Sequence, residues 1–260
     1  MSIDVHPTAI VDKNAVLNDG VKVGPYTVIE SDTLIGENTN IGSHVLIAEG
    51  TRIGGKCQIF KGAALGLIPQ DLKFHGEKTT LEIGNDTIIR EFATLNRGTE
   101  ASGVTLIGND SLIMAYVHVA HDCVIGNKVI LANGINMGGH VIIEDHVTVG
   151  GMTPIHQFVR IGRYSFIGGG YRALKSIPPY VIATGEPMVY RTLNLIGLKR
   201  NGFSRETIKA LSGAYKQIYG KNSKLQEGLA ALKSNDNLIP EVKNIIEFFE
   251  ASTRGVIGSE

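Results

Sequence analysis

The chain has 260 residues with 25 basic and 25 acidic side chains, so its formal net charge is zero. A neutral chain has no long-range field that would attract nucleic acid or an anionic membrane surface, so we expect neither as a partner. Its 32 glycines, its lack of tryptophan and its many β-branched residues favour short strands joined by tight corners.

The first residues, 1–7, lack the basic segment and apolar core of a signal peptide. No run of about 18 apolar residues follows, so no membrane span is expected. The two cysteines, Cys57 and Cys123, lie far apart and neither belongs to a CxxC pair. Free thiols in a reducing, cytoplasmic location are therefore the expectation.

A large aliphatic residue recurs at every sixth position from Val11 to Ile167, and only Asp71, Glu77 and Ala101 interrupt this register. A period of six does not match the 3.6-residue period of an α-helix. We interpret each hexad as a short strand plus a corner, with the aliphatic residue pointing inward and the next residue turning the chain. Three hexads would form a triangular coil of about 18 residues, with coils stacked roughly 4.8 Å apart. The sequence therefore predicts an all-β parallel β-helix.

Two segments lose the register, and both have lengths that are multiples of six. Residues 69–80 are polar and begin with Pro69-Gln70-Asp71, and residues 99–104 form a second, shorter break. We expect both to project from corners as loops, which are common places for binding residues.

Helical patterns replace the repeat towards the carboxy terminus. Ser204 is a suitable N-cap for a helix over residues 205–219 that ends at Gly220. Residues 225–232 and 240–249 are expected to form further helices, the last one starting with a proline. We therefore divide the chain into a β-helix over residues 1–187 and a C-terminal helical domain over residues 188–260, which would cover one end of the solenoid.

The coil length brings distant polar residues to one corner. With about 18 residues per coil, Asp122 lies below His140, and His121 lies below Gly139, which lies below Gln157. His156 adjoins this corner, and His118 precedes His121 by half a hexad. One corner over three coils would therefore gather His121, Asp122, Gly139, His140, His156 and Gln157.

Three interpretations of this corner compete. Three histidines could bind zinc, although no thiol or second carboxylate completes an obvious coordination sphere. The histidines could instead only satisfy hydrogen bonds at the corner. The third interpretation is acyl transfer by general-base catalysis, with a histidine as base, Asp122 as its orienting partner and a glycine amide as oxyanion donor. The sequence favours this third interpretation.

Short motifs over essentially the whole chain resemble a known family, the UDP-N-acetylglucosamine 3-O-acyltransferases, which carry out the first acylation of lipid A biosynthesis. These motifs are Gln70-Asp71-Leu72-Lys73, His118-Val119-Ala120-His121-Asp122-Cys123, Leu131-Ala132-Asn133, Gly139-His140, Gly150-Gly151-Met152, His156-Gln157-Phe158, Pro178-Pro179-Tyr180, Gly197-Leu198-Lys199-Arg200 and Gly202-Phe203-Ser204-Arg205. The resemblance to hexapeptide-repeat proteins also implies the left-handed form of the β-helix, which the period alone does not determine.

The resemblance implies an enzyme that takes a (3-hydroxy)acyl chain from acyl carrier protein, without a cofactor or metal. It implies a homotrimer with active sites between neighbouring solenoids. His121 matches the family's general base, Asp122 the residue that orients it, and the Gly139 amide the oxyanion donor. The family's contacts to the sugar nucleotide or the donor match Gln70, Asp71, Lys73, His118, His140, His156 and Gln157, and its contacts to the nucleotide end match Asn194 and Arg200.

Some positions depart from the family or refine its implications. Ile196 stands where the family often has glutamate, and Asn201 where a second arginine is frequent. Gly169 matches the family's acyl-chain ruler, and a glycine there implies an open channel and a long chain. The sister N-acyltransferase has an extra amino-terminal domain, whereas the hexads here begin at Val11. A 3-amino sugar nucleotide as acceptor, a hydratase of the γ-carbonic-anhydrase type and a purely structural solenoid stay open.

Overall fold

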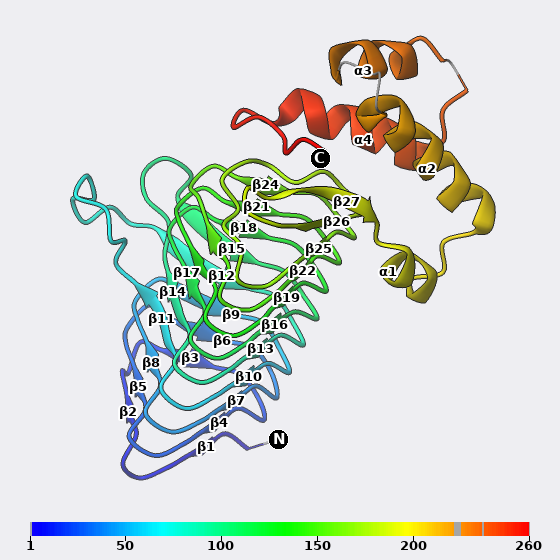
Figure 1. Ribbon diagram of the computed structural model, residues 1–260. Helices are drawn as coiled ribbons and strands as arrows, with labels where there is room; N and C mark the ends of the chain where they lie inside the picture. Colours follow the sequence, from blue (N-terminus) through cyan, green and yellow to red (C-terminus); the bar gives the residue numbers. More distant parts are fainter. Residues whose placement is uncertain (1, 221–224, 236, 260) are drawn as a thin grey trace.

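The chain winds into a left-handed parallel β-helix whose short strands stack into three flat faces, and helices follow at its carboxy-terminal end (Figure 1). The computed structural model describes residues 2–220, 225–235 and 237–259. The predicted fold class, an all-β solenoid followed by a helical segment, is confirmed.

Each face of the prism is one sheet of very short strands. The first sheet consists of β1 (Asp4–Val5), β4 (Lys22–Val23), β7 (Asn40–Ile41), β10 (Gln58–Ile59), β13 (Ile88–Ile89), β16 (Leu112–Ile113), β19 (Ile130–Leu131), β22 (Thr148–Val149), β25 (Phe166–Ile167), β26 (Val181–Thr184) and β27 (Val189–Leu193). The second consists of β2 (Ile10–Val11), β5 (Val28–Ile29), β8 (Leu46–Ile47), β11 (Ala64–Leu67), β14 (Thr94–Asn96), β17 (His118–Val119), β20 (Asn136–Met137) and β23 (Pro154–Ile155). The third consists of β3 (Val16–Leu17), β6 (Leu34–Ile35), β9 (Thr51–Ile53), β12 (Thr80–Ile83), β15 (Val104–Ile107), β18 (Val124–Ile125), β21 (Ile142–Ile143) and β24 (Arg160–Ile161).

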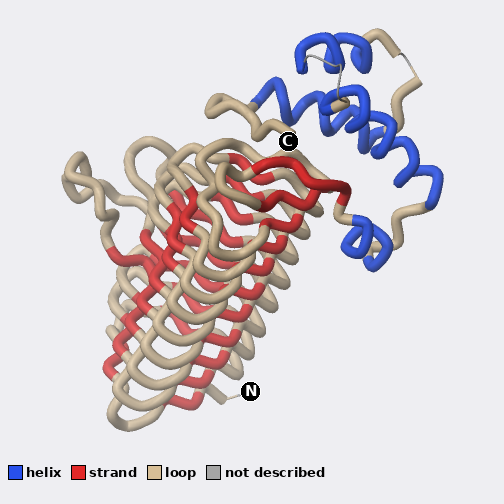
Figure 2. The backbone as a smooth tube through the Cα atoms, viewed as in Figure 1, coloured by secondary structure: helices blue, strands red, loops and turns tan. Residues whose placement is uncertain are grey.

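The strand register shows where the coil is regular and where it is interrupted. Val119 pairs with Met137, 18 residues further on, as three hexads per coil require. Leu95 pairs with Val119, 24 residues further on, and Ile59 pairs with Ile89, 30 residues further on. The additional six and twelve residues leave the coil as two loops, which project from the solenoid in Figure 2.

The predicted aliphatic register forms the core. Its members are buried from Val23 onward, and only Val11 and Leu17, at the open amino-terminal end, are half-buried. A second buried row, which we did not predict, lies two residues before the first and holds smaller side chains such as Val117 and Cys123. Cys57 also belongs to this row, so packing accounts for both thiols.

The corners differ in one respect from the prediction. The chain does not turn at the residue after the aliphatic one. The turn occupies the second and third residues after it, and the third adopts a positive φ, as at Asp122 (58°), His140 (60°) and Phe158 (65°). Aspartate and histidine tolerate this left-handed conformation better than most residues, so the corners can present polar and aromatic side chains.

The carboxy-terminal segment begins with a return strand. β27 runs antiparallel to β26, so the first sheet continues past residue 187. The helices are α1 (Leu195–Arg200), α2 (Arg205–Tyr219), α3 (Leu225–Lys233) and α4 (Pro240–Ala251). For α2 the predicted bounds and the Ser204 cap agree with the structure, whereas no bounds were predicted for α1.

The helices cover the carboxy-terminal end of the solenoid (Figure 1). The buried Tyr215 hydroxyl of α2 donates to the Pro179 carbonyl at 2.6 Å. The Tyr180 hydroxyl donates to Asn244 Oδ1 in α4 at 3.1 Å. These two contacts hold α2 and α4 against the last coil, so the helices cover the sheet edges that would otherwise be open at this end. Among the described residues, no helix combines the length and the apolar character that crossing a bilayer requires.

Candidate functional site

The candidate site lies on the edge between the second and third sheets. We call it the His121 edge and define it as residues 120–122, 138–140 and 156–158, the stacked corners of three successive coils. The His140 N–H donates to the His121 carbonyl at 3.1 Å, and the Phe158 N–H donates to the Gly139 carbonyl at 3.2 Å. These bonds confirm the predicted stacking of His121, Gly139 and Gln157.

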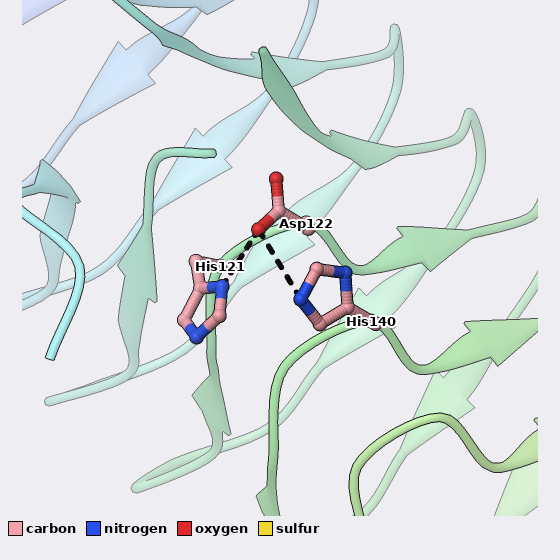
Figure 3. Close-up of side chains that lie close together, drawn as sticks. All are labelled: His121, Asp122 and His140. Carbon is pink, nitrogen blue, oxygen red and sulfur yellow. Dashed lines mark hydrogen bonds and ion pairs between the residues drawn. The ribbon is translucent and has the colours of Figure 1, made fainter. Parts of the chain in front are cut away.

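His121 and Asp122 are joined by a side-chain hydrogen bond at this edge. His121 Nδ1 lies 2.7 Å from Asp122 Oδ2 (Figure 3). An ionised carboxylate can only accept hydrogen bonds, so the imidazole proton resides on Nδ1. In the neutral ring the second nitrogen, Nε2, therefore carries the lone pair, and the His121 side chain keeps 14 % exposure through which a proton donor can reach it.

The Asp122 carboxylate is completely shielded from solvent, with a side-chain exposure of 0 %. Burial alone would raise the pKa of this carboxyl group, but hydrogen bonds from Ser102, His121 and Thr99 outweigh burial and hold the pKa well below its usual range. Thr99 donates its N–H to Oδ1 at 2.9 Å and its hydroxyl to Oδ2 at 2.7 Å. Asp122 is therefore a stable anion beneath the histidine.

Gly139 lies against the His121 ring from the next coil. A Cβ at this position would stand 2.5 Å from His121 Cε1 and 2.7 Å from Nε2, so only glycine allows the observed ring position. Within the described residues, the Gly139 N–H has no hydrogen-bond acceptor. At the equivalent position on another edge, the Asn109 N–H donates to Asn127 Oδ1 at 2.9 Å. The Gly139 amide thus lacks the capping side chain found elsewhere and can donate to a ligand.

Two further histidines of the predicted cluster, His140 and His118, border this pair. His140 Nε2 lies 3.7 Å from Asp122 Oδ2, and its ring stacks on Phe158 with 4.6 Å between centroids. His118 Nδ1 lies 2.8 Å from the Thr94 hydroxyl. Burial, followed by repulsion from His121, lowers the pKa of His118 although the Thr94 contact opposes this, so we expect a neutral ring near pH 7.

The longer loop, residues 68–79, brings a second carboxylate to the site. Asp71 Oδ2 lies 3.9 Å from His121 Nε2, on the side of the ring opposite to Asp122. Its Oδ1 accepts the Lys73 N–H at 3.0 Å. Asp71 and Lys73 line a cavity of about 380 Å³ together with Glu77, Thr99, Glu100, Ala101 and His140. The exposed Gln70 lies at the start of the same loop.

His156 and Gln157 continue the edge one coil above Gly139, and both are exposed. The Arg254 Nη2 lies 3.1 Å from His156 Nδ1. Nδ1 also lies 3.2 Å from the Gln157 carbonyl oxygen, so the two contacts favour opposite tautomers of the ring. The carboxy-terminal segment thus reaches His156, in a contact that sequence spacing could not indicate.

Three predicted residues lie elsewhere in this chain. Asn194 caps α1, where its side chain accepts the Gly197 N–H at 3.1 Å and donates to the Tyr164 carbonyl at 2.9 Å. Tyr164 belongs to the edge between the third and first sheets, and the exposed Arg200 ends α1. Gly169 lies on the remaining edge, after β25. A single chain does not bring these residues to His121.

The cluster of His121, Asp122 and His140 also offers three ligand atoms within 4.8 Å of one another. Imidazole nitrogens and a carboxylate are suitable ligands for zinc. However, the 2.7 Å contact between His121 and Asp122 is a hydrogen bond, whose proton a metal ion would have to replace. The observed geometry therefore matches an oriented imidazole base better than a set of metal ligands.

Comparison with known proteins gives two family matches. Residues 177–257 match the family described as UDP N-acetylglucosamine O-acyltransferase, domain 2. Residues 14–49 and 105–134 match the bacterial transferase hexapeptide family (six repeats).

Full-length relatives are similar over nearly the whole chain. The acyl-[acyl-carrier-protein]–UDP-N-acetylglucosamine O-acyltransferase of Neisseria meningitidis serogroup B is 52% identical over 254 residues, which cover 97% of this chain and 98% of the relative. The solved structure of LpxA from Acinetobacter baumannii has a TM-score of 0.93 and 42% identity, and the match covers 97% of this chain and 99% of that one. The UDP-N-acetylglucosamine acyltransferase of Francisella novicida has a TM-score of 0.95 and 34% identity, with coverages of 98% and 94%.

Proposed function

Because the chain belongs to the UDP-N-acetylglucosamine O-acyltransferase family, we propose that it transfers a (3-hydroxy)acyl chain from acyl carrier protein to the 3-hydroxyl of UDP-N-acetylglucosamine. This is the first acylation of lipid A biosynthesis and would take place in the cytoplasm. One observation carries the proposal: His121 is oriented by a buried carboxylate and lies beside the Gly139 amide, which has no acceptor within the described part of the chain.

His121 is the general base of the proposed reaction. As the sugar O3 attacks the thioester carbonyl carbon, its proton passes to His121 Nε2, because the other ring nitrogen already donates to Asp122. Asp122 stabilises the imidazolium that results. When the carbon–sulfur bond breaks, the imidazolium returns the proton to the departing thiolate. This direct transfer needs no nucleophilic side chain, and burial raises the pKa of the nearby Cys123 thiol to about 12.

The Gly139 N–H is the proposed oxyanion donor. Negative charge develops on the thioester oxygen as the tetrahedral intermediate forms, and a fixed N–H stabilises that charge. The Gly139 amide suits this role because it has no competing acceptor among the described residues and lies against the base. Base and donor would therefore act on the same reacting centre, the base on the attacking hydroxyl and the donor on the carbonyl oxygen.

The remaining contacts are proposed from the family resemblance. Gln70, Asp71, Lys73, His118, His140, His156 and Gln157 would contact the sugar nucleotide or the donor, and Asn194 and Arg200 the nucleotide end. Asp71 has support from its 3.9 Å distance to His121 Nε2, where the attacking hydroxyl has to bind. Asn194 and Arg200 lie away from the His121 edge, so they would contribute from a neighbouring subunit, which fits the proposed homotrimer.

The acceptor and the chemistry can be tested together. Purified protein is assayed with paired 3-hydroxy and 3-amino sugar nucleotides against a series of acyl carrier protein thioesters. We expect O-acylation of UDP-N-acetylglucosamine, and exclusive transfer to the 3-amino sugar would reject the proposed acceptor.

The variant His121→Ala tests the base. It should stay trimeric and lose nearly all transfer, whereas wild-type turnover would reject His121 as the general base. Elemental analysis of chelator-treated protein tests the hydratase alternative, which requires stoichiometric zinc.

A further inference from the structure

The shorter loop, which runs from β14 to β15, has a defined shape next to Asp122. The Gly103 N–H donates to the Thr99 carbonyl at 2.7 Å and closes a tight turn. The Gly98 N–H donates to the Thr80 carbonyl at 3.1 Å, and the Thr80 N–H donates to the Gly103 carbonyl at 2.9 Å. Both ends of the loop are therefore tied to the same residue of β12, and the loop has little freedom to shift relative to the coil.

The hydrogen-bond pattern determines which way the Thr99 hydroxyl points. The Ala101 N–H donates to Thr99 Oγ1 at 3.2 Å, so this N–H occupies a lone pair of the oxygen. The single hydroxyl proton is then directed to Asp122 Oδ2, 2.7 Å away. The Ser102 hydroxyl accepts the Val104 N–H, and its proton is shared between Asp122 Oδ1 and the Val104 carbonyl oxygen, which lies 2.9 Å away.

These contacts occupy both oxygens of the carboxylate. Oδ1 accepts from the Thr99 N–H and the Ser102 hydroxyl, and Oδ2 accepts from the Thr99 hydroxyl and His121 Nδ1. Three of the four donors belong to the loop, and only one is the histidine. The loop therefore determines both the rotation of the carboxylate and how much of its charge is left to attract the imidazole proton.

We propose that Thr99 and Ser102 are positioning residues for acyl transfer, which hold the Asp122 carboxylate in the one orientation that presents Oδ2 to His121 and moderate its pull on the imidazole proton. This inference rests on the proposed function, since it assigns a role to residues that act through the base. It also gives the six-residue break in the repeat a purpose, because the loop supplies the hydroxyl groups that reach the Asp122 carboxylate, whereas the nearby coil hydroxyl, that of Thr105, accepts the Asp122 N–H at 2.8 Å.

The proposal predicts a pH effect with a definite sign. The charged or titratable groups that face His121 are Asp122, Asp71, His118 and His140. Loss of a donor to Asp122 leaves its carboxylate more basic, so it stabilises the His121 imidazolium more strongly. His121 must be neutral to act as base, so kcat/KM should fall at low pH as His121 takes up a proton. This acid limb of the pH profile should therefore move to higher pH when a loop hydroxyl is removed.

The test compares Thr99→Val with Thr99→Ser. Valine keeps the shape and the N–H but removes the hydroxyl, whereas serine retains it. We expect Thr99→Val to lower kcat roughly tenfold with little change in KM, consistent with the loss of one hydrogen bond to a charged group. Its acid limb should lie at higher pH than that of the wild type, and Thr99→Ser should restore both properties. Ser102→Ala should shift the limb in the same direction.

Thr87→Val is the matched control. The Thr87 hydroxyl is buried in the repeat, whereas Thr99 is half-buried, and it donates to the Gly108 carbonyl at 2.8 Å, on a different edge. This variant should keep the wild-type acid limb. NMR titration of His121 without substrate separates the inference from the proposed function: an unchanged His121 titration in Thr99→Val overturns the positioning role, while absent transfer by the wild type overturns the function itself.

Discussion

The His121 ring occupies the space that a side chain at residue 139 would need, because a Cβ there would stand 2.5 Å from His121 Cε1. This contact joins the proposed base on one coil to the proposed oxyanion donor on the next. The distance between these two groups is therefore set by the stacking of the coils rather than by flexible side chains.

The first prediction concerns Gly139→Ala. The added methyl group has to displace the His121 ring, which weakens its bond to Asp122 and moves Nε2 from its position. We expect kcat to fall by on the order of 100-fold, since misplacing a catalytic group by about 1 Å has an effect of this size. Steady-state kinetics with the sugar nucleotide at saturation measures the change.

Gly213→Ala is the control for this substitution. Its Cβ would meet no atom within 4 Å, and the residue lies inside α2, so alanine should slightly stabilise the helix. Wild-type kcat in Gly139→Ala would contradict the assigned contact, and an equal loss in both variants would point to a general effect of replacing glycine.

The regular coil explains how much of this site could be predicted from sequence. Each coil from β15 to β25 has the same length, so adding 18 to a residue number gives its neighbour, as the pair Val119 and Met137 demonstrates. The stacking of His121 below Gly139 followed from that regularity alone. A periodic backbone thus makes distant contacts as predictable as local ones.

The contacts that were missed come from segments without a period. The path of the loop holding Thr99 and Ser102 depends on hydrogen bonds to Thr80, for which spacing gives no signal. The helix α1 has only six residues and a single buried one, Leu198, so no amphipathic pattern marks it. A Thr-x-x-Ser sequence in a break beside the His–Asp pair was the one available indication of the loop's role.

The second prediction concerns pH and His118. Burial and repulsion from His121 lower the pKa of His118, so the folded chain binds this proton less readily than the unfolded chain does. The neutral ring therefore contributes stability above the unfolded pKa of about 6.5, and this contribution is lost as pH falls through the folded value. The free energy of unfolding, measured with denaturant, should decline between pH 7.5 and pH 5, and this decline should be weaker in His118→Gln than in the wild type. An identical decline in the two proteins would contradict the prediction.

The third prediction concerns the loop that carries Asp71. Arg97 donates to the Glu49 carbonyl at 3.0 Å, and its guanidinium lies 5.6 Å from the centre of the Phe74 ring. Phe74→Ala removes this cation–π contact and loosens the loop. A contact of this kind contributes about 0.5–1 kcal/mol at an exposed site, so we expect KM for the sugar nucleotide to rise roughly two- to fivefold, with a smaller change in kcat.

Leu72→Ala is the matched control on the same loop. The Leu72 side chain is fully exposed, so its truncation removes no packing. If Leu72→Ala raises KM as much as Phe74→Ala does, the effect belongs to the loop surface and the Arg97 contact does not position Asp71.

The last prediction concerns Gly169, the proposed position of the acyl-chain ruler. A Cβ at residue 169 would stand 2.9 Å from the Gly151 carbonyl oxygen, so any side chain requires a small backbone shift between the two coils. Gly169→Ala introduces this shift with only a methyl group, whereas Gly169→Met adds a long side chain that would fill the channel. We expect both variants to lose similar stability in thermal unfolding, but only Gly169→Met to prefer shorter donors across a series of acyl carrier protein thioesters. An unchanged chain-length profile would remove the ruler role, and the same profile change in both variants would assign it to the backbone rather than to the occupied channel.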